Sequence, residues 1–70
     1  MTDTLTDRVQ ELRAEAKRLG VDDSDVDMPD PTGAVIVYAD LLGLDDAIVF
    51  DLSLTLDQIR VASAMVGGGR

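Results

Sequence analysis

Residues 34–55 read AVIVYADLLGLDDAIVFDLSLT and contain the two most apolar stretches of the 70-residue chain. Both stretches are rich in β-branched and aromatic residues, which favour β-strands. In the second stretch Phe50, Leu52 and Leu54 alternate with polar residues, as they do in a half-buried strand. The segment therefore predicts a β-hairpin, with strands over residues 34–41 and 47–54 joined by a turn.

Helix signals occupy the same segment and give a second interpretation. Pro31 suits the first turn of a helix, Gly43 suits its end, and Asp45 and Asp46 suit the start of another. Under this alternative the chain is all-α, with four short helices. We favour the hairpin, which makes the chain an α+β protein in the order helix, strand, strand, helix.

The segments on either side of this region predict helices. Gly20 is placed to end the first helix, over residues 4–19, and Thr55 with Gln58 forms a capping box that opens the second, over residues 56–66. Residues 67–70 are rich in glycine, and we expect a flexible tail there. The first helix rests on apolar residues at intervals of four and three, which share one stripe of a helix: Leu5, Val9, Leu12, Ala16 and Leu19.

Residues 21–33 form an acidic segment with two prolines and a glycine, and this composition predicts a loop. Asp23, Asp25 and Asp27 have the alternate spacing of the first three ligands in a calcium-binding loop. Met28 stands where that loop needs its glycine, and Ala34 stands where it needs its closing glutamate. These aspartates are therefore only a weak metal candidate, and a solvated acidic loop is the expectation.

A chain of 70 residues has room for one small domain, here residues 1–70. A single core of this size supplies only ~3–5 kcal/mol of stability. The chain has no Cys for disulfides, and without Cys or His it lacks the ligands of ordinary structural zinc sites. Self-association is the remaining source of stability, so we expect a homo-oligomer.

The second face of the predicted hairpin is the main candidate interface. It is too apolar to be fully exposed, yet it carries Asp40 and Asp51, which need hydrogen bonds or arginines if a partner buries them. Arg60 is the local cation placed to fold back on them; the alternative is that both carboxylates lie in water at a sheet edge. The stripe of the first helix is a further candidate for pairing between copies. The candidate interface residues are Ile36, Tyr38, Asp40, Val49 and Asp51 on the hairpin, and Leu5, Val9 and Leu12 on the helix.

The composition argues against several classes of function. The chain has no His, Cys or Trp, and so lacks the usual base near neutral pH, the thiolate nucleophile and the best platform for base stacking. We therefore expect a protein that is not an enzyme and uses no cofactor. A net charge of −8 repels phosphate backbones, so nucleic acid is not an expected partner.

Membrane insertion is not expected either. The longest unbroken apolar run, residues 34–39, is far shorter than the ~20 residues that span a bilayer. A cytoplasmic location is the default, or a virion if the chain is viral.

Assembly with other protein chains is the function that these observations favour. The leading hypothesis is a self-assembling structural or accessory subunit of a larger particle, such as that of a virus or phage. A second hypothesis is an acidic inhibitor that mimics nucleic-acid phosphate and blocks a basic protein surface. A third is a small cytosolic protein of a saline organism, in which the acidity reveals nothing about partners.

Overall fold

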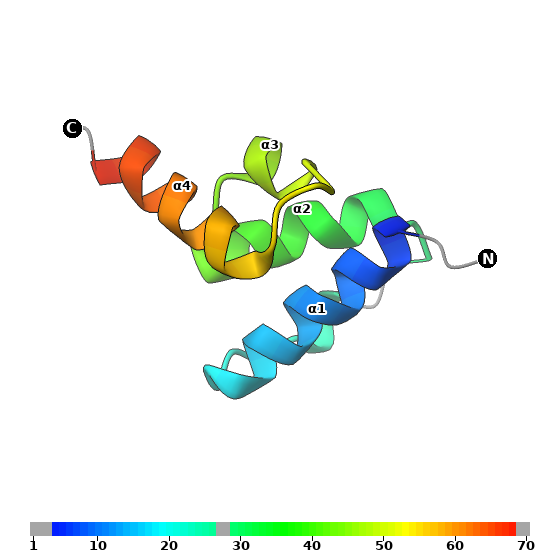
Figure 1. Ribbon diagram of the computed structural model, residues 1–70. Helices are drawn as coiled ribbons and strands as arrows, with labels where there is room; N and C mark the ends of the chain where they lie inside the picture. The colour runs from blue at the N-terminus through cyan, green and yellow to red at the C-terminus, as the bar shows by residue number, and fades with distance from the viewer. Residues whose placement is uncertain (1–3, 27–28, 69–70) are drawn as a thin grey trace.

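The segment that predicts a hairpin is helical. The computed structural model describes residues 4–26 and 29–68. Over these ranges it contains helices and no strand, so the α+β prediction is wrong and the four-helix alternative matches the fold. The elements, shown in Figure 1, are α1 (Thr4–Arg18), the short 3₁₀ helix η1 (Ser24–Val26), α2 (Pro31–Leu42), α3 (Asp46–Val49) and α4 (Leu56–Gly68).

Strong start and stop signals make residues 31–42 a helix. The Asp30 carboxylate accepts a hydrogen bond from the Thr32 N–H at 3.2 Å, and Pro31 occupies the first turn of α2. Gly43 ends the helix in the left-handed conformation, with φ of 69°, and its N–H donates to the last turn. The helix-end signals, together with the burial of one side of α2, outweigh the β preference of its β-branched residues.

The alternation at Phe50, Leu52 and Leu54 belongs to a turn. The Asp51 carboxylate accepts from the Ser53 N–H at 3.2 Å, and the Leu54 N–H donates to the Asp51 carbonyl at 3.1 Å. Phe50 and Leu54 are half-buried, whereas Leu52 is exposed. The apolar residues at every second position therefore belong to a compact connection between α3 and α4 and not to a strand.

The core lies mainly between α1 and α2, with α3 and α4 closing it at one end. In α2 the buried residues follow a helical spacing, so that Val35 and Tyr38 share a face; a strand would have placed them on opposite faces. The buried apolar residues of the core are Leu12, Ala16, Val26, Ala34, Val35, Tyr38, Ala39, Val49 and Ile59.

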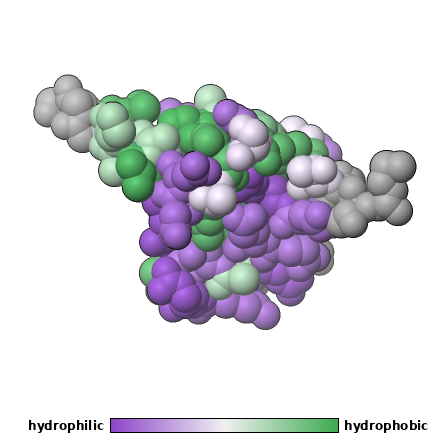
Figure 2. All heavy atoms as spheres, in the orientation of Figure 1, coloured by the Kyte–Doolittle hydropathy of each residue, from purple (hydrophilic) through white to green (hydrophobic). Residues whose placement is uncertain are grey.

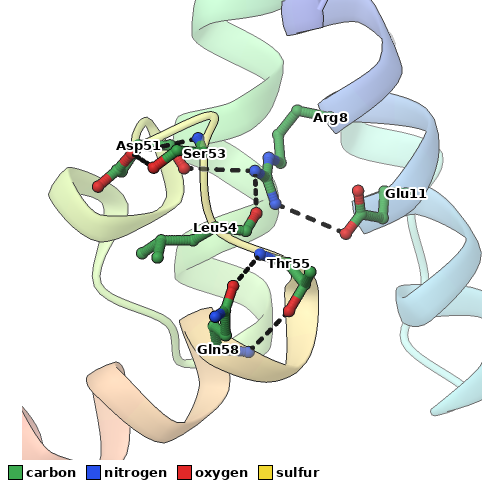
Figure 3. Close-up of polar contacts among 7 residues, drawn as sticks. All are labelled: Arg8, Glu11, Asp51, Ser53, Leu54, Thr55 and Gln58. Carbon is green, nitrogen blue, oxygen red and sulfur yellow. Dashed lines mark hydrogen bonds and ion pairs between the residues drawn. The ribbon is translucent and has the colours of Figure 1, made fainter.

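Arg8 of α1 holds the connection between α3 and α4, as Figure 3 shows. Its side chain is 4% exposed, and its Nη2 donates to the Leu54 carbonyl at 2.6 Å and to the Asp51 carbonyl at 3.3 Å. Nη1 lies 3.5 Å from a carboxylate oxygen of Glu11. A second link joins Arg60 of α4 to Glu15 of α1 at 2.6 Å. Two arginines thus fasten the C-terminal part of the chain to α1.

Helix α4 begins at the predicted capping box. The Thr55 N–H donates to Gln58 Oε1 at 2.8 Å, and the Gln58 N–H donates to Thr55 Oγ1 at 3.3 Å (Figure 3). The helix continues to Gly68, past the predicted end at residue 66. Residues 67 and 68 of the predicted tail are therefore helical, and residues 69 and 70 lie outside the described part of the chain.

Candidate interaction surface on the last helix

The outward side of α4 is the most exposed apolar surface that the structure describes. Val61 is 61% exposed, Met65 is 74% exposed and Val66 is 60% exposed. Ala64 lies beside them and is also exposed. We call Val61, Ala64 and Met65, which lie on one side of the helix, the α4 apolar face. Figure 2 shows hydrophobic residues gathered over this helix, while the region of α1 below is mostly hydrophilic.

Helical geometry directs Val61 and Met65 away from the body, whereas Val66 lies two turns after Ile59, on the same side of the helix as that buried residue, and is exposed near the end of α4. Ile59 is fully buried, and one turn later the Ser63 hydroxyl accepts a hydrogen bond from the Asp45 N–H at 3.0 Å. Because these two residues face the core, Val61 and Met65 lie on the opposite side of the helix. Figure 1 shows the later part of α4 extending beyond the other helices, so that its own chain leaves this side uncovered.

The electrostatics of this surface differ from those of the rest of the molecule. Residues 61–68 read VASAMVGG and include no charged side chain, although the chain as a whole has a net charge of −8. A shallow cleft of about 310 Å³ runs along the helix and is lined by Asp57, Gln58, Val61, Ala62 and Met65.

The structure places five of the eight predicted interface residues in or against the core, and the other three on the surface. Tyr38 and Val49 belong to the core because their segment is helical and its pleated second face does not exist, and Leu12 belongs to it because the apolar stripe of α1 packs inward. Leu5 and Val9 are half-buried against that core. The exposed members are Ile36, Asp40 and Asp51.

Arg60 does not pair with Asp40 or Asp51 as the sequence suggested, because it reaches Glu15. Asp51 instead accepts from Ser53, whose hydroxyl and N–H hydrogen bonds lower the pKa of this exposed carboxyl from its ordinary value of 3.8. Asp40 and Asp51 are thus surface groups, and the alternative that places them in water fits the structure better than burial does.

Four aspartates share a local role, which the sequence indicated only for Asp45. In each, a carboxylate oxygen accepts a hydrogen bond from the backbone N–H two residues later, at distances of 3.0–3.2 Å. Such turns satisfy N–H groups at helix starts. The pairs are Asp22 with Ser24, Asp30 with Thr32, Asp45 with Ala47 and Asp51 with Ser53.

The candidate metal ligands are only partly described. Asp23 lies 3.4 Å from the guanidinium of Arg13 and accepts a long hydrogen bond, also 3.4 Å, from the Tyr38 hydroxyl. The side chain of Asp25 and the whole of Asp27 lie outside the described residues. Within residues 4–26 and 29–68, no three His, Cys, Asp or Glu side chains are grouped to hold a metal ion.

Asp23 and Tyr38 line a polar cleft of about 420 Å³ between α1, η1 and α2. Burial raises the pKa of the Tyr38 phenol above its ordinary value of 10.0, and the Asp23 carboxylate raises it further. With Asp23 already paired to Arg13, the charges in this cleft are balanced within the chain.

No protein-family model matches the chain, and no curated protein and no solved structure matches it. Within the described residues, every helix is too short or too polar to cross a membrane.

Proposed function

We propose that the protein is a non-enzymatic assembly subunit that associates with further copies of itself through the α4 apolar face. One observation carries the proposal: Val61 and Met65 are more than half exposed on a helix whose last eight residues have no charge. Exposed apolar side chains that lie together on one surface are typical of sites of protein contact.

The charge distribution favours a second copy as the occupant. Copies with a net charge of −8 repel one another, and contact through an acidic surface would place carboxylates together. Pairing of two α4 apolar faces avoids this cost. In a two-fold arrangement the same surface serves both copies, and an antiparallel crossing near Ala64 brings Met65 of one helix close to Met65 of the other.

The size of the α4 apolar face sets how strongly two copies are expected to associate. A stable interface buries ~800 Å² on each partner, and three side chains on one helix cover less than this. We therefore expect weak, concentration-dependent pairing that is strengthened when many subunits assemble together.

Analytical ultracentrifugation over a range of concentrations tests the proposal. We expect the mass of the native chain to rise with concentration and Met65→Asp to weaken association at least ~10-fold, which is about 1.4 kcal/mol. Leu19→Asp is the matched control, because Leu19 is 50% exposed, lies after α1 and receives the same added charge. A native chain that stays monomeric at every concentration contradicts the proposal, as does equal weakening by both variants.

The absence of cysteine from the chain allows a second measurement. A single Met65→Cys variant should form a disulfide-linked dimer under mild oxidation much faster than a Leu19→Cys variant. Equal rates would show that the α4 apolar faces do not meet.

A further inference from the structure

A groove between α2 and α3 has a different chemistry from the α4 apolar face. It has a volume of about 340 Å³, with an apolar floor and two carboxylates, and its lining residues are Ile36, Val37, Asp40, Leu44 and Asp46. Ile36 is 45% exposed, although it lies in the middle of the most apolar helix. The groove is thus open to an aliphatic side chain from outside.

The two carboxylates of the groove are free to take a ligand. Asp40 and Asp46 are exposed, and within the described residues neither side chain takes part in a hydrogen bond or ion pair. The neighbouring Asp45 differs, because its carboxylate accepts from the Ala47 N–H. Asp40 and Asp46 therefore offer charge that the fold does not use.

We infer that this groove binds a short basic segment of a different protein, with an aliphatic side chain on the floor and Lys or Arg beside Asp40 and Asp46. An apolar floor with charged edges recognises an amphipathic segment of opposite charge. The negative charges of Asp40 and Asp46 select a basic partner, and the exposed Ile36 selects an aliphatic side chain. The groove is separate from the α4 apolar face, which is the surface proposed for self-association.

A second copy of the chain is poorly suited to this groove. Four of the arginines are already in ion pairs within their own chain, and Arg8 is also buried. Their partners are Glu11 for Arg8, Asp23 for Arg13, and Glu15 for both Arg18 and Arg60. Among the described cations this leaves Lys17 without an ion pair, and one lysine does not match two carboxylates, so we expect the cations to come from another protein.

Titration with a synthetic amphipathic peptide of leucine and lysine tests the inference by NMR, with the full chain labelled with ¹⁵N and ¹³C-methyl groups. We expect saturable shifts at Ile36, Val37 and Leu44, and weaker binding as salt is added. A leucine–glutamate peptide and a serine–lysine peptide, which lack the charge and the apolar anchor respectively, should not produce these shifts.

Variants then separate the groove from general attraction to an acidic protein. Asp40→Asn and Asp46→Asn should each weaken binding roughly 2-fold to 5-fold, the range for exposed ion pairs. Asp57→Asn, an equal charge change on exposed α4, should have no comparable effect. Equal effects of all three variants, or shifts confined to other surfaces, would overturn the inference.

Ultracentrifugation of Ile36→Asp distinguishes this site from self-association. The variant should lose peptide binding and keep the self-association of the native chain. Loss of self-association in a folded Ile36→Asp variant would assign the groove to contact between copies and overturn the inference. Failure of Met65→Asp to alter association would instead count only against the proposed function.

Discussion

Aspartate supplies all ten acidic residues between Val21 and Gln58, and glutamate supplies none. The four carboxylates at positions 22, 30, 45 and 51 each bind an N–H two residues later. A short side chain suits this contact, which is why aspartate is preferred over longer acids at helix starts and turns. Part of the acidity of this chain therefore has a local structural cause.

Tyr38 gives a prediction for high pH. Its folded-state pKa is raised above 10.0 by burial and by Asp23, so the folded chain keeps the phenol proton more tightly than the unfolded chain. The contribution to stability is complete below pH 10 and declines as the pH rises through the folded-state pKa. Because Tyr38 is the single tyrosine and there is no tryptophan, ultraviolet absorbance can follow its ionisation directly.

We expect the free energy of unfolding to fall above pH 10 in the native chain and to fall less in Tyr38→Phe, which has no phenol to ionise. Asp23→Asn should shift the absorbance titration toward the ordinary pKa, because it removes a nearby negative charge. A native titration midpoint at or below 10 would contradict the structure.

The helices differ in how well the sequence predicts them. At the two ends, regular apolar spacing and a capping box agree with each other, and α1 and α4 lie close to the expected ranges. In the centre, β-branched residues and a short alternation pointed to strands, while Pro31, Gly43 and Asp45 pointed to helices. The boundary signals matched the structure, because hydrogen bonds at helix ends are fixed locally whereas β preference depends on tertiary context.

The candidate surface on α4 was predictable only in part. The absence of charge over residues 61–68 is visible in the sequence, but it does not show which side of the helix is exposed. Which side of α4 faces outward depends on Arg60 reaching Glu15 and Ser63 reaching Asp45, contacts between distant segments. No local pattern contains that information.

Arg8 gives a prediction about how α1 is joined to the connection before α4. Arg8→Ala leaves the carbonyls of Asp51 and Leu54 without this donor, and we expect a loss of about 1–3 kcal/mol in the free energy of unfolding. Arg13→Ala is the matched control on the same helix. Because the Arg13 side chain is 54% exposed, loss of its pair with Asp23 should cost less than ~1 kcal/mol.

Urea denaturation followed by circular dichroism measures both losses. Equal destabilisation by the two substitutions would show that the Arg8 contacts contribute no more than an exposed ion pair.

The molecule as a whole separates charge from apolar surface. Figure 2 shows a largely hydrophilic region over α1 and hydrophobic residues toward α4. The net charge of −8 is spread over a small body with a radius of gyration of 11.6 Å. Repulsion between carboxylates therefore opposes the compact state, and dissolved ions weaken that repulsion.

We expect the midpoint of thermal unfolding to rise as salt is added from low to physiological concentration. The Met65→Asp variant, in which we expect weaker association, should show the same trend, which separates screening within one chain from stronger association between chains. A midpoint that falls with added salt would mean that attractive ion pairs dominate. Folding only in molar salt would instead favour adaptation to a saline cytoplasm.

The four aspartate turns also bear on the order in which the chain folds. Each turn joins positions two residues apart, whereas Arg8 and Leu54 are separated by 46 positions. Closing a short segment costs less chain entropy and takes only nanoseconds, while contact between distant segments must wait for the chain to collapse. We therefore expect the aspartate turns to restrict the unfolded chain early, and the arginine contact that secures α4 to form later.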